Sequence, residues 1–264
     1  MPFVDLGELR TRYELTGDKE PVLVLSNSLG TDFSMWDPQM AELAQRFRIL
    51  RYDTRGHGQS SVTADDYTID QLGRDVLGLL DALGLKRVHF CGLSMGGMIG
   101  IWLGVHAPNR LHRLVLCNTA ARIGTKEMWN ARIATVRKDG MKSVAAAVIE
   151  RWFTPEFRAS FPQKVARAQQ MLENTPPGGY SACCAAIRDM DQRDKVGEIR
   201  VPTVVIYGGK DPVTPAGDTR FLVEQIRGAR TVELNAAHLS NVEQPDAFTE
   251  AVSHFLSSEE THNG

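Results

Sequence analysis

One serine in this chain has the surroundings expected of a nucleophile. Ser94 lies in Gly92-Leu93-Ser94-Met95-Gly96, after a short apolar run typical of a buried strand and before apolar residues with helical spacing. Glycines on both sides allow a sharp strand-to-helix turn that leaves the serine exposed above a sheet. A tight turn with a solvated serine would carry the same five residues, but the position between a strand and a helix favours catalysis.

A serine hydroxyl attacks a carbonyl only when a base removes its proton and a third group orients that base. The sequence offers both partners, because Asp211 and His238 each follow a later strand pattern. The order Ser, Asp, His along the chain is the one found with this type of turn. We therefore expect Ser94, Asp211 and His238 to form a catalytic triad. Asp218 and Asp189 are alternative carboxylates for orienting the imidazole.

A sheet of mostly parallel strands can bring residues so far apart in sequence to one edge. Short apolar runs, buried on both faces, alternate with longer helical patterns such as those at 68–83 and 98–106, which predicts right-handed crossovers in one open sheet. Residues 12–15 are expected to add an antiparallel edge strand. The runs expected to be strands are 22–26, 48–52, 88–92, 113–117, 204–208 and 230–234.

The strand pattern stops after Asn118 and resumes at Val201. Between them the chain reads as successive helices, rich in Ala, Arg and Met and interrupted by prolines. A helical insertion between two strands of such a sheet is most simply a cap over the edge where ligands bind. We expect a core domain of residues 1–120 and 192–264 and a helical cap domain of residues 121–191, and the polar tail 257–264 is expected to be disordered.

Composition narrows the classes of function. The chain has 264 residues, 42% of them hydrophobic, and a net charge of −2, which indicates neither a nucleic-acid partner nor a membrane surface. Its start lacks the features of a signal peptide, and no apolar run is long enough to span a bilayer, so we expect a cytoplasmic protein. The four cysteines lack metal-binding spacing. No metal or organic cofactor is expected, and nothing in the sequence indicates an oligomeric state.

The three candidate residues in these contexts resemble the α/β-hydrolase superfamily, and the resemblance covers essentially the whole chain. The segment 53–60 (Asp-Thr-Arg-Gly-His-Gly-Gln-Ser) is similar to a turn common in that superfamily, so Asp53, Arg55 and His57 are expected to be structural. The resemblance implies an α/β-hydrolase fold, a mostly parallel open sheet with helices on both faces and a helical cap inserted late in the sheet. An oxyanion hole requires two backbone N–H groups, which by position would come from Met95 and Leu29.

The oxyanion segment also narrows the resemblance. Many relatives carry His-Gly there, whereas this chain has Ser-Asn-Ser-Leu-Gly-Thr-Asp at 26–32, followed by Met-Trp-Asp at 35–37. Together with Gly-Leu-Ser-Met-Gly-Gly at 92–97 and Ala-Ala-His-Leu-Ser-Asn-Val-Glu at 236–243, this is similar to the 3-oxoadipate enol-lactonases of bacterial aromatic catabolism. The resemblance implies hydrolysis of a small lactone through an acyl-enzyme, without a cofactor.

Such a lactone carries a carboxylate that must meet cations or hydrogen-bond donors in a partly dry pocket. Trp129 and Arg132 are three residues apart and would share a helix face, and Trp152 lies on a later cap helix. We expect these three residues to bind the substrate. The alternative interpretation is that both tryptophans pack the cap against the core and Arg132 is a solvated surface group.

Other functions would use the same triad. A general carboxylesterase, a carbon–carbon bond hydrolase acting on a ring-cleavage product and a perhydrolase differ from a lactonase in the cap and oxyanion segment, which sequence predicts poorly. A ligand-binding module that has lost turnover is a further alternative. The complete set of Ser94, Asp211 and His238 argues against such a module, because binding requires none of the three.

Overall fold

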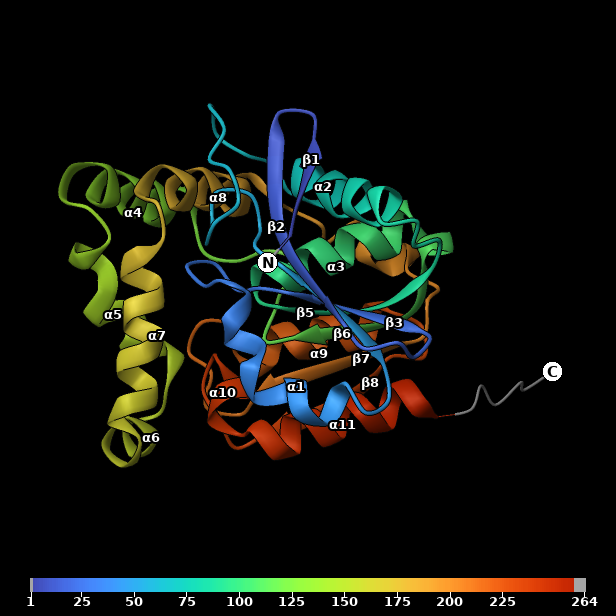
Figure 1. The fold of residues 1–264 in the computed structure, drawn as a ribbon. Helices are drawn as coiled ribbons and strands as arrows, with labels where there is room; N and C mark the ends of the chain where they lie inside the picture. Colours follow the sequence, from blue (N-terminus) through green and yellow to red (C-terminus); the bar gives the residue numbers. More distant parts are fainter. Residues whose placement is uncertain (1, 259–264) are drawn as a thin grey trace.

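An eight-stranded sheet forms the centre of the computed structural model, which describes residues 2–258. Its strands follow the order β1-β2-β4-β3-β5-β6-β7-β8, with β2 antiparallel to both neighbours and the remaining pairs parallel (Figure 1). This confirms the predicted mostly parallel open sheet. The strands are β1 (Phe3–Leu6), β2 (Leu9–Thr16), β3 (Val22–Ser26), β4 (Arg48–Tyr52), β5 (Val88–Leu93), β6 (Leu111–Cys117), β7 (Thr203–Gly208) and β8 (Arg230–Leu234).

The prediction that residues 12–15 form the edge of the sheet was wrong. They lie within β2, and β1 pairs on its outer side with Phe3 opposite Arg12. Gly7, at φ +72°, lies in the turn that joins the two strands. A conformation that only glycine adopts without strain permits this tight connection, so a strand of mixed polarity forms the true edge.

Helices cover both faces of the sheet. α2 and α3 pack together on one face, while α1 and α11 pack together on the other (Figure 1). Thr68 caps α2 with a hydrogen bond from the Gln71 N–H, which satisfies a backbone donor at the start of the helix. The helices outside the insertion are α1 (Asp37–Leu43), α2 (Ile69–Ala82), α3 (Met95–His106), α9 (Ala216–Gln225), α10 (Ser240–Glu243) and α11 (Pro245–Ser257), with 3-10 turns η1 (Phe33–Trp36) and η2 (Pro108–Arg110). A third 3-10 turn, η3 (Val196–Glu198), directly precedes β7.

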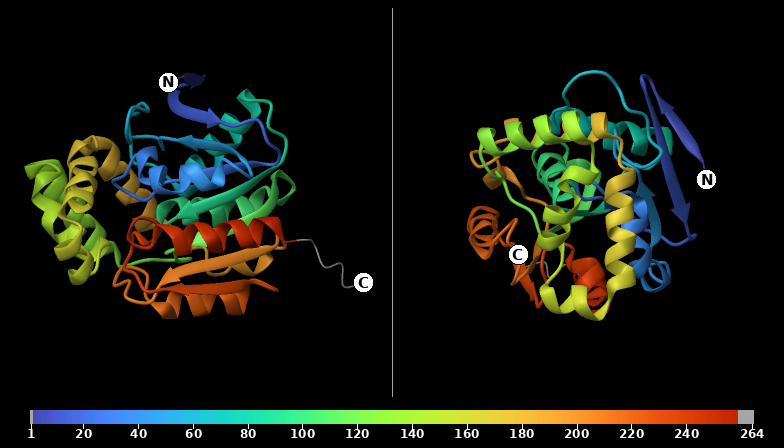
Figure 2. Two further views of the ribbon diagram at one scale, coloured as in Figure 1. Left: turned by 60° about the horizontal axis from the view of Figure 1, so that its bottom comes forward. Right: turned by 90° about the vertical axis from the view of Figure 1, so that its left-hand side faces the viewer.

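Five helices fill the insertion between β6 and β7 and gather at one end of the sheet, as both views in Figure 2 show. We call them the cap helices; the domain boundaries expected from the sequence stay a prediction. The cap helices are α4 (Lys126–Asp139), α5 (Lys142–Trp152), α6 (Pro155–Ser160), α7 (Pro162–Asn174) and α8 (Pro177–Asp189). No helix within residues 2–258 is long and apolar enough to cross a membrane.

The polar tail predicted to be disordered begins inside a helix. Ser257 is the last residue of α11. Residues on the apolar side of this helix, such as Phe248 and Val252, are buried. The burial of that side extends the helix into the first residue of the tail. Residues 259–264 lie outside the described residues.

Candidate active site

A strained turn holds Ser94 between β5 and α3. Its φ of +56° is unusual for a residue with a side chain and directs the serine out of the strand direction. A Cβ atom on Gly92 would lie 2.1 Å from the Gly96 carbonyl oxygen, and one on Gly96 would lie 2.2 Å from that of Ser26. The turn therefore requires both glycines, which explains the sequence pattern sterically.

The structure brings Ser94, His238 and Asp211 together. The Oγ atom of Ser94 lies 2.9 Å from Nε2 of His238, and Nδ1 of the same ring lies 2.8 Å from Oδ2 of Asp211. All three residues are at least 95% buried. Each follows the carboxyl end of a strand, β5, β7 or β8. The arrangement allows the imidazole to take the serine proton while the carboxylate stabilises the imidazolium that forms.

Hydrogen bonds hold the Asp211 carboxylate in place. Its Oδ2 accepts from the Asn118 amide at 2.9 Å and the Thr214 hydroxyl at 2.6 Å, and its Oδ1 accepts from the Val213 N–H at 2.7 Å. Burial alone would raise the pKa of Asp211, but the charge and hydrogen bond of His238, with the hydrogen bonds from Asn118 and Thr214, lower it below the usual value. Asp211 is thus held as an acceptor for the imidazole.

The two alternative carboxylates lie elsewhere. Asp189 forms an ion pair with Arg188 at 2.6 Å near the end of α8. Asp218, in the first turn of α9, makes no ion pair with His238 among residues 2–258. The neighbour that the structure gives the imidazole is therefore Asp211.

The backbone N–H groups of Leu29 and Met95 have no hydrogen-bond partner within the described residues, although the groups flanking them do. The Ser28 N–H donates to the Met35 sulfur, and the Gly30 N–H donates to His57 Nε2 at 2.9 Å. Two free donors beside the nucleophile are what a developing oxyanion requires. The proposed roles of Leu29 and Met95 fit this pattern.

His57 holds the oxyanion segment by accepting the hydrogen bond from the Gly30 N–H. It is fully buried, which lowers its pKa to about 4, and its Nδ1 lies 3.3 Å from the Arg55 carbonyl oxygen. The ring is therefore neutral at ordinary pH, with a proton on Nδ1 and a lone pair on Nε2 for the Gly30 N–H. The sequence predicted a turn residue, and its contact with Gly30 was missed.

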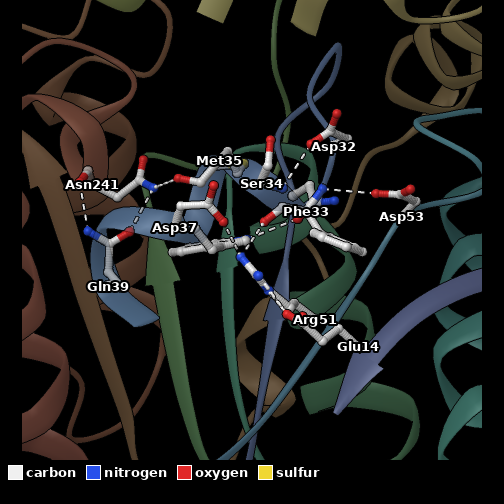
Figure 3. Close-up of polar contacts among 12 residues, drawn as sticks. Glu14, Asp32, Phe33, Ser34, Met35, Asp37, Gln39, Arg51, Asp53 and Asn241 are labelled. Carbon is white, nitrogen blue, oxygen red and sulfur yellow. Dashed lines mark hydrogen bonds and ion pairs between the residues drawn. The ribbon is translucent and has the colours of Figure 1, made fainter. Parts of the chain in front are cut away.

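Further contacts hold the turn η1 that follows the oxyanion segment (Figure 3). Arg51 bonds Glu14 and Asp37 at 2.5 Å, and its guanidinium lies over the Phe33 ring. The Phe33 N–H donates to Asp53 at 2.9 Å, which links η1 to the segment 53–60. Asp53 is thus structural, as predicted.

A pocket of about 280 Å³ lies between this edge of the sheet and the cap helices. Ser94 and His238 line it on the sheet side, together with Leu29. The predicted substrate-binding residues line it on the cap side: Trp129, Arg132 and Trp152. Arg132 is thus not simply a solvated surface group, although both tryptophans also pack in the core.

Trp129 lines the pocket without offering a free indole N–H to it. Its indole N–H donates to the Ile123 carbonyl oxygen at 2.9 Å, because the loop before α4 folds back over the ring. The Arg132 guanidinium lies over the indole, 4.8 Å from its centroid. Trp129 therefore supports Arg132 by a cation–π contact.

Arg151 was missed in the sequence. It lies at the end of α5 and lines the same pocket as Arg132, with Tyr180 of α8 beside them. Burial and the charge of Arg132 lower the pKa of Arg151. Neither arginine forms an ion pair with a carboxylate among residues 2–258. Its position directly before Trp152, which was predicted to bind the substrate, is the sequence feature that could have indicated Arg151.

Candidate metal ligands are lacking in the described part of the chain, since no three His, Cys, Asp or Glu side chains there could surround an ion. The four cysteines are buried free thiols. The Sγ atoms of Cys91 and Cys117 approach to 3.8 Å between neighbouring strands, and burial raises the pKa of Cys117. These thiols are packing groups far less reactive than a thiolate.

Comparisons with known proteins agree with this architecture. Residues 21–245 match the model of the α/β-hydrolase fold family. A 3-oxoadipate enol-lactonase of Acinetobacter baylyi is 44% identical over 88% of this chain and 87% of its own. The crystal structure of the enol-lactonase from Burkholderia xenovorans LB400 superposes with a TM-score of 0.96 at 45% identity, over 97% of this chain and all of that one. A thermophilic esterase from Thermogutta terrifontis gives 0.89 at 30% identity, over 94% and 93%. This chain belongs to the α/β-hydrolase fold family.

Proposed function

We propose that the protein opens 3-oxoadipate enol-lactone, a small enol-lactone bearing a carboxylate, to 3-oxoadipate through an acyl-enzyme on Ser94. One observation carries this proposal: one pocket has a hydrogen-bonded Ser94 and His238 on one side. On its other side lie the guanidiniums of Arg132 and Arg151, neither of which has a carboxylate partner among residues 2–258. Relatives 41–44% identical carry the name of this lactonase, which supports the assignment.

The chemistry follows from the geometry. As Ser94 Oγ attacks the ring carbonyl, His238 Nε2 takes its proton, and the N–H groups of Leu29 and Met95 stabilise the oxyanion. Collapse of the intermediate breaks the ring C–O bond and expels an enol oxygen, which takes the proton from His238. An enolate is a better leaving group than an alkoxide, so little acid assistance is needed.

Hydrolysis of the acyl-enzyme restores the site. The released enol tautomerises to a ketone, which makes ring opening effectively irreversible. His238 then takes a proton from water, whose oxygen attacks the acyl carbon, and returns the proton to Ser94 Oγ as the acid leaves. Every proton that leaves or returns to Ser94 Oγ in this cycle passes through His238.

Arg132 and Arg151 would hold the carboxylate of the substrate. A guanidinium donates two parallel hydrogen bonds to a carboxylate, and partial burial strengthens them. The indole of Trp129 supports Arg132 from below, and Trp152 contributes an apolar wall. The substrate would therefore lie with its ring carbonyl at Ser94 and its carboxylate toward α4 and α5.

The decrease of the ultraviolet absorbance of the enol-lactone, measured with purified protein, tests this function. The same preparation is assayed with p-nitrophenyl acetate and with a ring-cleavage dienoate, the substrates of a general esterase and a carbon–carbon bond hydrolase. We expect the highest kcat/KM with the enol-lactone. A higher value with either of the other substrates would overturn the lactonase assignment. The cytoplasmic location and the absence of a nucleic-acid partner stay predictions from the sequence.

A further inference from the structure

The four-residue helix α10 is separated from His238 by Leu239 alone and lies at the end of the sheet that faces the cap helices (Figure 1). Three of its side chains are polar and at least 93% buried, and each contacts a different part of the site. Ser240 donates to Asn118 at 2.6 Å, and Asn118 in turn donates to Asp211. Asn241 donates to the Met35 carbonyl oxygen at 2.9 Å, next to the oxyanion segment (Figure 3).

The third side chain, Glu243, is a buried carboxylate without an ion pair among the described residues. Its Oε2 accepts from the Ala237 N–H at 3.0 Å and from the Thr154 N–H at 3.3 Å, and its Oε1 accepts from the Thr154 hydroxyl. A buried carboxylate is costly unless such donors satisfy it. The three donors come from two places only: the residue before His238 and the junction between α5 and α6.

A second contact ties the other side of His238 to the same junction. The Leu239 N–H donates to the Trp152 carbonyl oxygen at 3.0 Å. Thr154 itself is a fixed point, because its hydroxyl caps α6 by accepting from the Phe157 N–H at 3.2 Å. Leu239 is thus bound directly to the segment between Trp152 and Thr154, and Ala237 is linked to the same segment through the Glu243 carboxylate.

We propose that Glu243 is a positioning residue, which sets the distance between the His238 imidazole and Ser94 by linking the Ala237 amide to the junction of α5 and α6. Glu243 does not line the pocket, so it acts through His238 rather than on the substrate. The inference rests on the proposed roles of Ser94 and His238 as nucleophile and base. It does not depend on the identity of the lactone, because any ester hydrolysed at Ser94 needs the same imidazole position.

The test compares Glu243→Ala with Glu243→Gln on p-nitrophenyl acetate, well below the melting temperature of each variant. Alanine removes all three acceptor contacts, whereas glutamine keeps an oxygen for the Ala237 and Thr154 N–H groups. Because a shift of about 1 Å in a catalytic group can cost on the order of 100-fold, we expect kcat of Glu243→Ala to fall by about 10- to 100-fold with little change in KM. Glu243→Gln should stay within about threefold of the unsubstituted protein.

Labelling of Ser94 by a fluorophosphonate should slow by the same factor as kcat. A lower Tm with unchanged kcat and labelling rate would show that Glu243 only stabilises the fold, and would overturn the proposal. A rise in KM for the enol-lactone alone would also overturn it, because the effect would then pass through the cap and not through His238. An enzyme that hydrolyses p-nitrophenyl acetate but not the lactone contradicts the proposed substrate and leaves this comparison intact.

The Thr154 side of the link provides a second test if Glu243→Ala does not fold. Thr154→Val removes the hydroxyl that donates to Glu243, whereas Thr154→Ser retains it at nearly the same place. We expect kcat on p-nitrophenyl acetate to fall several-fold in the valine variant and to be restored in the serine variant. Equal kcat in both variants would contradict a link through Thr154.

Discussion

The two sides of the pocket differ in how completely their polar groups are satisfied. On the sheet side, hydrogen bonds within the protein fix each charged or polar group of the triad, and Asp211 alone accepts from His238, Asn118, Thr214 and Val213. On the cap side, two guanidiniums have no carboxylate partner in the described chain. The difference indicates that the preorganised sheet side carries out the chemistry and that the cap side binds an anion.

Loss of the nucleophile or base should have the largest effect, and it tests the sheet side alone. In Ser94→Ala, His238→Ala and the double variant, we expect kcat on p-nitrophenyl acetate to fall by about 10⁶-fold in every case, because residues that act as a unit are not additive. Steady-state assays with enzyme at high concentration measure the remainder. Losses that multiply in the double variant would contradict a single catalytic unit.

The next largest effect should be a pH dependence of the free energy of unfolding, caused by the buried His57 on the sheet side. The pKa of His57 is lowered by burial from 6.5 to about 4, so the unfolded chain binds a proton at His57 that the folded protein excludes. The free energy of unfolding should therefore fall between pH 6.5 and 4 by roughly 3 kcal/mol from this group and level off below pH 4. Denaturant titrations at several pH values measure it.

His57→Gln is the control for this prediction. Glutamine does not titrate, and its carbonyl oxygen can accept from the Gly30 N–H in place of the imidazole. The acid loss of stability should be smaller in this variant by the contribution of His57, while the loss from His89, whose pKa burial also lowers to about 4, should persist. Identical slopes in both proteins would contradict a buried neutral His57.

On the cap side, substitution should change binding and not chemistry. We expect Arg132→Ala and Arg151→Ala to raise KM for the carboxylate-bearing lactone by about 10- to 100-fold, as for a charged hydrogen bond worth about 1.5–3 kcal/mol. KM for p-nitrophenyl acetate should stay constant. Arg137→Ala is the matched control, since Arg137 lies on α4 but is exposed and pairs with Asp66. Equal effects on both substrates would remove these arginines from the site.

The smallest effect should come from Trp129→Phe. Because the indole N–H bonds the Ile123 carbonyl oxygen, its loss should lower the free energy of unfolding by about 1 kcal/mol. KM for the lactone should change by less than about threefold, since a phenyl ring still supports the Arg132 guanidinium. An increase as large as that of Arg132→Ala would mean that the indole binds the substrate after all.

The same contrast explains what could be predicted from the sequence. The strands and the Ser94 turn were predictable because their signals are local: apolar runs buried on both faces, and glycines that steric contact at 2.1–2.2 Å requires. Asp211 and His238 followed from their positions after strands. Parallel strands align such positions at one edge whatever the details of packing.

The cap residues were harder to predict because tertiary packing decides their roles. Arg151 carries no local sign that distinguishes it from other arginines of the cap, and only the packing of α5 against α4 and α7 turns it into the pocket. The indole N–H of Trp129 could donate to a ligand, but it donates to the carbonyl oxygen of the loop residue Ile123 instead. The contact between His57 and Gly30 joins two separate loops, and neither segment has a sequence pattern that would predict it.

The central claim is that Ser94 carries the opened lactone, and mass spectrometry of acid-quenched enzyme tests it most directly. Opening a ring expels no fragment, so the peptide containing Ser94 should gain the whole mass of the enol-lactone within the first turnovers. The gain should be absent in Ser94→Ala, which should also leave the lactone unhydrolysed. An adduct on another residue, or unchanged lactone hydrolysis by Ser94→Ala, would contradict the account.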